Sequence, residues 1–388
     1  MNLAPGLIDM MSALVAIPSA SSFEPSKDEG NQGVVDLLGT WLEGLGFTLE
    51  LQGLPGRAPR SNLIARLGSG PGGLVLAGHA DTVACEQGRW SHDPYSLTEE
   101  GGRYYGLGIA DMKVFFAVAI EAAKSFASMP FREPLYVVAT ADEECAMEGA
   151  HKLVELGKPR ARYVIVGEPT SLQPVRMHKG MMMTSVRLKG RSGHSSAPAA
   201  GASALDAMVA VCNEMMVWRE ELRANHHDAN FEVPIPTLNL GTMHGGDHPN
   251  RICGECELQM DLRPLPGMDN EELRGIMVER IERAIAGRGV ELQIGALFPG
   301  TVPMHTPADS PLVLFAEETT GKKAGSAGYG TEAPHFARLG MDVIVMGPGD
   351  IAQAHQPDEY VEAVRLEPAV EVTRRMIDRF CVRADSPS

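Results

Sequence analysis

Basic residues are scarce in this chain of 388 residues, which has 34 lysines and arginines against 50 aspartates and glutamates. The formal net charge is −16 at pH 7. Nucleic acids and anionic membranes attract basic proteins, because contacts with phosphate groups supply much of the affinity. The charge balance therefore argues against a nucleic-acid binder or a protein that docks on a membrane. It is compatible with a cationic or zwitterionic small substrate.

Long apolar runs are also missing. No stretch approaches the roughly 18 uninterrupted apolar residues of a membrane-spanning helix. The first residues, Met-Asn-Leu-Ala-Pro-Gly, lack the basic segment and the apolar stretch of a signal peptide. The six cysteines are sparse and irregularly spaced, which favours free thiols over a disulfide framework. We therefore expect a globular protein of the reducing cytoplasm.

One cysteine pair, Cys253 and Cys256, has a spacing found in zinc sites, but the sequence has no second pair to complete such a site. In the strand where we place these residues, the two side chains should point to opposite faces. We interpret them as small packing residues.

The length of the chain predicts two domains. In residues 1–180, apolar runs alternate with stretches of helical periodicity. The runs are 62–67, 73–78, 134–140 and 163–167, and the helical stretches are 6–18, 31–46, 113–129 and 145–157. This alternation predicts an α/β domain with a mixed, mostly parallel sheet buried between helices. The pattern returns in residues 298–388, with a strand at 342–346 and a final helix at about 361–381.

Residues 181–297 follow a different order of elements. The pattern predicts a strand at 181–188, a helix at 202–223, strands around 237–241 and 255–263, a helix at 270–286 and a strand at 290–295. The order β-α-β-β-α-β is typical of the ferredoxin-like arrangement. We interpret this segment as a second domain inserted into the first, which then comprises residues 1–180 and 298–388.

Polar side chains gather where the apolar strands of the first domain end. They are His79 and Asp81, Asp142 with Glu143 and Glu144, Glu168, and His355, together with Asp111 just before a helix. Open α/β sheets bind ligands beyond the carboxyl ends of their strands, so these side chains should meet in one crevice. Histidines and carboxylates are a natural set for two divalent ions about 3.5–4 Å apart with one bridging carboxylate. Nitrogen and oxygen ligands without thiolate suit zinc, cobalt or manganese.

These segments resemble the ordered motifs of the M20 family of dinuclear metallopeptidases and deacylases. The motifs are Gly-His79-Ala-Asp81-Thr-Val, Gly-Leu-Gly-Ile-Ala-Asp111-Met-Lys, Ala-Thr-Ala-Asp-Glu143-Glu144 and Gly167-Glu168-Pro-Thr. Further segments at 88–94, 167–180, 245–253, 261–268 and 354–360 are similar to members that deacetylate N-acetyl-L-ornithine. The similarity covers essentially the whole chain. It implies that residues 181–297 form the family's lid and dimerisation domain.

The resemblance also implies a role for each strand-end residue. One metal ion would be held by His79 and Glu168, the other by Glu144 and His355, with Asp111 bridging the two. Asp81 would orient His79 through its second ring nitrogen. Glu143 would take a proton from the attacking water and pass it to the leaving amine. We interpret Asp142 as a structural helix cap.

Substrate contacts follow from the same resemblance. His194 resembles the lid-domain histidine that reaches into the site of the partner subunit, where it would help to stabilise an oxyanion. Its structural alternative is a turn residue beside Gly193. Arg251 would hold the α-carboxylate of the substrate, and its alternative is a surface arginine. Asn250, Lys179 and Thr331 are further candidates. Ile109 and Val114 depart from the Thr and Gly expected beside Asp111.

The implied reaction is hydrolysis of N-acetyl-L-ornithine to L-ornithine and acetate, a step of arginine biosynthesis, by a homodimer with two zinc or cobalt ions. Other M20 deacylases remain alternatives, with succinyl-diaminopimelate, acetylcitrulline or another N-acyl amino acid as substrate. A metal-dependent binding protein without catalysis is a different class, and such a protein would not need Glu143. A nicotinamide oxidoreductase would need a third glycine in register after Gly106 and Gly108, which the sequence lacks.

Overall fold

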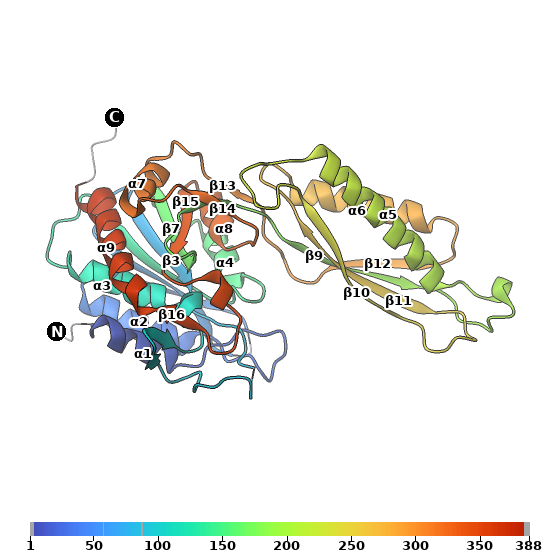
Figure 1. Cartoon of the computed structure of the whole chain (residues 1–388), viewed down its shortest axis with the longest axis horizontal. Helices are drawn as coiled ribbons and strands as arrows, with labels where there is room; N and C mark the ends of the chain where they lie inside the picture. The colour runs from blue at the N-terminus through green and yellow to red at the C-terminus, as the bar shows by residue number, and fades with distance from the viewer. Residues whose placement is uncertain (1–3, 57, 87, 384–388) are drawn as a thin grey trace. The chain divides into compact units, whose positions relative to one another are not determined.

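The computed structural model describes residues 4–56, 58–86 and 88–383, and the chain divides into two compact units. The first unit contains the residues up to Arg176, Thr306–Gly325 and the residues from Thr331 onward. The second unit contains Met177–His305 and Ser326–Gly330. The colours of Figure 1 follow the chain through both units and show the second as an insertion in the middle of the sequence.

The first unit is built on a mixed sheet in the strand order β1-β2-β6-β3-β7-β15-β8. The strands are β1 (Thr48–Leu54), β2 (Arg60–Leu67), β3 (Leu74–His79), β6 (Leu135–Thr140), β7 (Tyr163–Pro169), β8 (Val175–His178) and β15 (Asp342–Gly347). β6, β3, β7 and β15 are parallel neighbours, whereas β1 and β2 are antiparallel. The carboxyl ends of the four parallel strands therefore share one edge of the sheet, as the sequence predicts.

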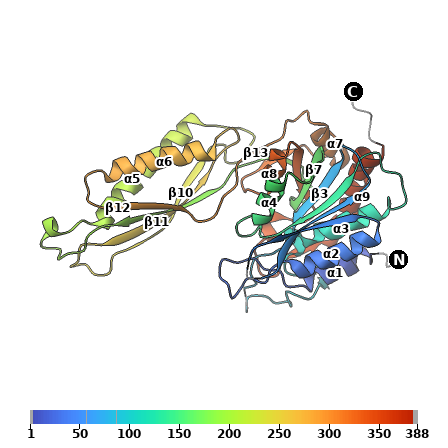
Figure 2. The same cartoon turned by 180° about the vertical axis from the view of Figure 1, so that it is seen from behind.

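Helices cover both faces of this sheet, and every residue of β3, β6 and β7 is buried. The main apolar cluster includes residues of α1 (Leu7–Val15), α2 (Gln32–Gly44), α3 (Val114–Lys124), α7 (Pro311–Thr320) and α9 (Leu366–Ile377). On the other face, α4 (Glu148–Leu156) packs against α8 (Ala333–Arg338), as Figure 2 shows from behind. Burying one large apolar side chain stabilises the fold by about 1.5–3 kcal/mol, so this core dominates the stability of the unit.

Two helix starts differ from the prediction. The final helix begins at Leu366 rather than near 361, because residues 360–362 form β16 and pair with β5 (Arg103–Tyr105), which in turn pairs with β4 (Thr98–Glu100). Helix α4 begins at Glu148 rather than 145, because the preceding residues turn around the Asp142 carbonyl. The Asp142 carboxylate accepts the Ala146 N–H at 3.1 Å within this turn, so Asp142 caps the turn and not the helix.

The second unit has the predicted order of elements. They are β9 (Met182–Lys189), α5 (Ala204–Asn225), β10 (Thr237–Gly245), β11 (Glu255–Arg263), α6 (Asn270–Ile285) and β12 (Glu291–Ala296). The antiparallel sheet has the order β10-β11-β9-β12, and its apolar face packs with α5 and α6. The side chains of Ser203 and Asp269 cap the two helices by accepting N–H groups of their first turns.

The inserted segment begins and ends on paired strands. The short strand β13 (Met304–His305) runs antiparallel to the end of β8, with Met304 opposite His178. The chain therefore enters and leaves the second unit about one strand spacing apart, roughly 4.8 Å.

The interpretation of Cys253 and Cys256 as packing residues is confirmed, but the prediction that they point to opposite faces of a strand was wrong. Cys253 and Cys256 are both buried in the apolar cluster of the second unit. Cys253 precedes the first residue of β11, Glu255, so the alternation of a strand does not apply to it. All six cysteines fall within the described residues and are free thiols. Among the described helices none is both long and apolar enough to span a bilayer.

Candidate metal centre

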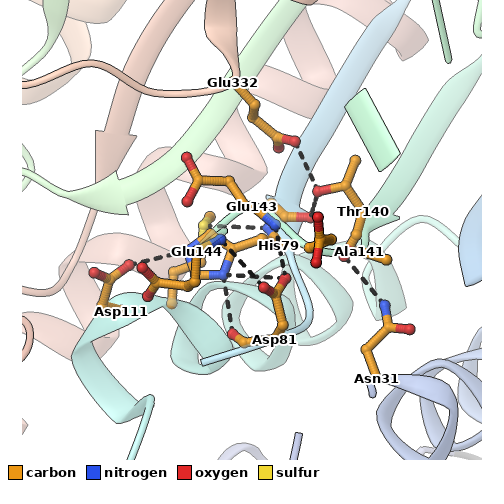
Figure 3. A network of polar contacts seen from close by, with 12 residues as sticks. Asn31, His79, Asp81, Asp111, Thr140, Ala141, Glu143, Glu144 and Glu332 are labelled. Carbon is orange, nitrogen blue, oxygen red and sulfur yellow. Dashed lines mark hydrogen bonds and ion pairs between the residues drawn. The ribbon is translucent and has the colours of Figure 1, made fainter. Parts of the chain in front are cut away.

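Six titratable side chains of the first unit meet at the carboxyl edge of its parallel strands. They are His79 at the end of β3, Asp111 in the turn before α3, Glu143 and Glu144 after β6, Glu168 in β7, and His355 after β15. Figure 3 shows four of them, His79, Asp111, Glu143 and Glu144. Gly167 lets β7 approach α3, because a Cβ atom there would lie 1.9 Å from the Phe115 ring. The sheet thus brings together residues that are far apart in the sequence.

Asp111 stands between the two histidines. Its Oδ1 lies 3.1 Å from Nε2 of His79, and its Oδ2 lies 3.5 Å from Nε2 of His355. The same nitrogen of His355 lies 3.0 Å from Oε2 of Glu144. One carboxylate that faces two imidazoles in this way has the geometry of a bridging ligand.

Two sets of possible ligand atoms lie within 4.8 Å of one another: His79 with Asp111 and Glu144, and His79 with Glu143 and Glu168. The first set includes Glu144, and the second includes Glu143, for which the sequence implies a different role. The donors are nitrogen and carboxylate oxygen, a combination that fits zinc, cobalt or manganese.

The electrostatics of the cluster also call for a cation. Burial raises the pKa of Glu143 and Glu168 well above the usual value, and neighbouring carboxylates raise both further. Burial opposes the ionisation of Asp111 as well. The hydrogen bond with His79 and the charge of that imidazole nevertheless lower the pKa of Asp111 overall. The hydrogen bond with Glu144 raises the pKa of His355 to about 9. Several carboxylates removed from water are costly unless positive charge compensates them, and divalent ions would do so.

Asp81 contacts His79 differently from the expectation. Nδ1 of His79 lies 3.0 Å from the backbone carbonyl oxygen of Asp81 and 3.8 Å from its carboxylate. The two carboxylate oxygens accept the backbone N–H groups of Glu143 at 3.3 Å and Glu144 at 3.2 Å. The main chain of Asp81 thus orients the imidazole, and its side chain holds the turn that carries both glutamates.

The predicted residues His194, Asn250, Arg251 and Lys179 belong to the second unit. The segments of His194 and Arg251 are joined by an isolated antiparallel bridge. Nδ1 of His194 accepts the backbone N–H of Ser196 at 3.2 Å and lies 2.8 Å from the Ser196 hydroxyl. Asn250 bonds to His248, and the exposed Arg251 forms an ion pair with Asp247.

Lys179 and Thr331 have structural contacts of their own. The buried ammonium of Lys179 donates to the carbonyl of Ile235 at 2.6 Å. The hydroxyl of Thr331, in the first unit, accepts the N–H of Ala333, the first residue of α8, at 3.1 Å. Both side chains are buried, and these contacts offset the cost of removing their polar atoms from water.

Two buried glutamates near the centre have no predicted role. Glu332 is fully buried, receives the Thr140 hydroxyl at 2.7 Å, and has a pKa raised by burial to about 7. Glu359 accepts backbone N–H groups of the loop that carries Asp111. Their partners are distant in sequence, so no local pattern could assign a role to either residue. Ile109 and Val114, the unusual residues of that loop, are buried in the apolar core.

Comparisons with known proteins identify the family of this chain. Residues 75–379 match the family described as peptidase family M20/M25/M40. The chain is 44% identical over 381 residues to an acetylornithine deacetylase of Pectobacterium carotovorum subsp. carotovorum (strain PC1), covering 98% of this chain and 99% of that protein. An acetylornithine deacetylase of Klebsiella pneumoniae (strain 342) is 43% identical over 380 residues, with the same two coverages.

Solved structures show the same fold. An M20 family metallo-carboxypeptidase from Sulfolobus solfataricus superposes with a TM-score of 0.75 at 16% identity, covering 96% of this chain and 99% of that chain. A tripeptidase from Staphylococcus aureus gives 0.74 at 21% identity and 96% of both chains. The chain therefore belongs to peptidase family M20/M25/M40, and it is a metal-dependent amide hydrolase.

Proposed function

We propose that this enzyme removes the acetyl group from N-acetyl-L-ornithine and releases L-ornithine and acetate. The observation that carries the reaction class is Asp111, whose two oxygens face His79 and His355, with the half-buried Glu143 beside His79. The choice of substrate rests on relatives at 43–44% identity over nearly their full length, which are named acetylornithine deacetylase. The six free thiols fit a cytoplasmic enzyme of arginine biosynthesis.

Two divalent ions, zinc or cobalt, would occupy the centre. His79 and Glu168 would hold one ion, Glu144 and His355 the other, and Asp111 would bridge them. When bound, the ions supply Lewis acidity, which makes water nucleophilic near neutral pH and polarises the amide carbonyl. The Asp81 carbonyl contact fixes the His79 ring with Nε2 toward Asp111, so this nitrogen is available as a ligand.

Glu143 would move the proton during the reaction. Its carboxylate accepts no hydrogen bond from the described residues, and burial raises its pKa well above the usual value. Such a group can take a proton from the attacking water and hold it near neutral pH. It can then deliver the proton to the leaving amine nitrogen of ornithine. Because the Asp81 carboxylate fixes the backbone N–H of Glu143, the base stays at the edge of the centre.

The second unit would supply substrate contacts. Because the Ser196 hydroxyl lies at Nδ1 of His194, the other ring nitrogen is left to donate to a developing oxyanion. The planar guanidinium of Arg251 would bind the α-carboxylate in exchange for its exposed ion pair with Asp247, which costs little to break. Asn250 lies beside Arg251 and would add a weaker contact. Lys179, and Thr331 of the first unit, would act through the backbone segments that they hold.

The resemblance to the family's dimerisation domain leads us to propose a homodimer through the second unit. Leu205, Val209, Met216 and Val217 leave an exposed apolar face along α5, and β10 lies at the edge of its sheet. Exposed apolar faces and edge strands are typical of interaction surfaces. Light scattering should give a molecular mass of twice the 41.6 kDa of one chain. The Val217→Glu variant should give a mass closer to that of the monomer. A wild-type monomer would contradict this proposal.

The substrate is tested with a panel of N-acylated amino acids. We expect kcat/KM for N-acetyl-L-ornithine to exceed, by about tenfold or more, that for N-acetyl-L-citrulline, N-succinyl-diaminopimelate and N-acetyl-L-methionine. Even a small change in one substrate group alters the activation free energy by about 1–3 kcal/mol, which corresponds to about 10–200-fold. A higher value for another substrate would reassign the enzyme within the family. Dialysis against EDTA should abolish turnover, and zinc or cobalt should restore it.

A further inference from the structure

Glu359 is the acceptor for the loop that carries Asp111. Its Oε1 accepts the N–H groups of Ala110 at 2.7 Å and Asp111 at 3.0 Å, and its Oε2 accepts the N–H of Gly108 at 2.8 Å. Its backbone carbonyl accepts a fourth N–H, that of Gly106, at 3.1 Å. One residue thus binds most of the backbone donors of the loop 106–111.

The loop depends on this acceptor because it lacks regular helical geometry. Gly108 has a φ of +73°, and Asp111 has a φ of −127° with a ψ of 87°, so the backbone departs from regular helical angles at both residues. Ala110 and Asp111 are buried, and buried backbone N–H groups require partners. A carboxylate is a strong acceptor for such groups, and Glu359 is only 2% exposed.

Glu359 also connects the two ligands that flank one metal position. Glu359 lies four residues after His355 in the same segment. Nε2 of His355 is 3.5 Å from the carboxylate of Asp111. The neighbouring Asp358 anchors this segment on its other side by accepting the N–H and hydroxyl of Ser91, both at 2.8 Å. The segment 355–359 therefore delivers one ligand directly and fixes another through the backbone of its loop.

We propose that Glu359 is a positioning residue that sets the Asp111 carboxylate relative to His355, so that both oxygens of Asp111 face their metal positions. The inference rests on the proposed metal centre, and Glu359 itself touches neither substrate nor metal. Because Asp111 contributes to both positions, a shift of its loop changes the geometry of both ions together.

The test compares Glu359→Gln with the wild type. A glutamine amide presents an NH₂ group where one carboxylate oxygen stood, so at least one loop N–H would face a donor and move away. We expect the metal affinity to fall about 10–100-fold, the range found when a supporting residue of a ligand is changed. The absorption spectrum of the cobalt-loaded protein should change as well, and kcat at saturating metal should fall more than KM changes.

Glu133→Gln is the matched control. The carboxylate of Glu133 also accepts a backbone N–H, that of Gly72 at 2.9 Å, but this contact lies before the start of β3, at the opposite end of the strands. The control should keep the metal affinity and the cobalt spectrum of the wild type. Glu359→Asp serves as a second variant, since it keeps the charge and shortens the reach by one methylene.

The outcomes separate this inference from the proposed function. If the wild type itself binds no metal, the proposed centre is wrong. If the wild type binds two ions and a folded Glu359 variant matches its affinity and spectrum, the positioning role is wrong. If neither Glu359→Gln nor Glu359→Asp folds, even with metal in excess, the positioning role is also wrong, because Glu359 would then be needed for the fold as a whole.

Discussion

The side chain of Asp81 binds the backbone N–H of Glu144, at 3.2 Å, and so ties the end of β3 to the turn that follows β6. The His79 ring meets the main-chain carbonyl of the same residue at 3.0 Å. A substitution at Asp81 therefore removes the support of the glutamate turn and leaves the contact with the imidazole in place.

Asp81→Asn separates these two roles. We expect metal affinity to stay within about threefold of the wild type, because the carbonyl contact persists. We expect kcat to fall about 10–100-fold. The NH₂ group of asparagine would face one of the two backbone N–H donors and push away the turn that carries Glu143. Metal titration and steady-state kinetics measure the two effects. A loss of metal affinity as large as the loss of kcat would show that the carboxylate acts on His79.

Glu143 and Glu144 should differ although they are adjacent. Glu143→Gln keeps the shape of the side chain but cannot accept a proton, so kcat should fall about 10²–10⁴-fold with both metal ions retained. Glu144→Gln should instead reduce the bound metal toward one ion. Metal analysis of both proteins, purified without chelator, gives the comparison. Equal metal loss in the two variants would make Glu143 a ligand.

Arg60 is expected to be important for stability. Its guanidinium, 10% exposed, lies 2.5 Å from Asp28 and 2.7 Å from Asp142, which are themselves nearly buried. Arg60→Leu leaves both carboxylates without their cation and should destabilise the fold by about 3–5 kcal/mol. Chemical denaturation measures this difference.

The control for Arg60 is Arg89→Leu, which removes an exposed ion pair with Glu86 and should cost at most about 1 kcal/mol. Adding Asp28→Asn and Asp142→Asn to Arg60→Leu should recover part of the stability, since no buried charge then lacks a partner. A small effect of Arg60→Leu alone would contradict the prediction.

His335 should make the fold sensitive to acid. Burial, helped by His151 and Arg338, lowers the pKa of His335 to about 3, and the two imidazole rings pack edge to face at 4.5 Å. The unfolded chain takes up this proton near pH 6.5, whereas the folded chain resists it, so stability falls as the pH drops from 6.5 toward 3. At pH 5 the loss from this group is about 2 kcal/mol.

His335→Phe tests this pH dependence, because phenylalanine keeps an aromatic ring and cannot titrate. The variant should lose less stability than the wild type between pH 7 and pH 5, by about the 2 kcal/mol given above. His227→Phe, at an exposed position, should leave the wild-type slope unchanged. Parallel pH profiles for the wild type and His335→Phe would show that His335 stays unprotonated in both states or protonates in both.

The strand ends could be predicted because their signals are local. An apolar run that stops at His79 or at Glu143 and Glu144 is visible within eight residues of sequence, and parallel strands then bring such ends to one edge. The order of elements in the second unit could be predicted for the same reason. Its helices and strands are long enough to show their own periodicity.

Contacts between distant segments could not be predicted in this way. The hydrogen bond from the Asp111 N–H to Glu359 joins residues 248 positions apart. The pairing of β16 with β5 makes the final helix start later than its own sequence indicates. Cys253 lies just before β11, so the alternation of side chains in that strand does not determine where it points. In these cases the contact that determines the local structure involves residues elsewhere in the chain, so local periodicity and composition do not predict it.

The pairing of β8 with β13 has an evolutionary consequence. Since the second unit leaves and rejoins the first on adjacent strands, a recombination event that exchanges it must restore only one short spacing. The unit that carries the metal centre and the unit that carries the proposed substrate contacts can then diverge at separate rates, because neither has to change its own core when the other is replaced.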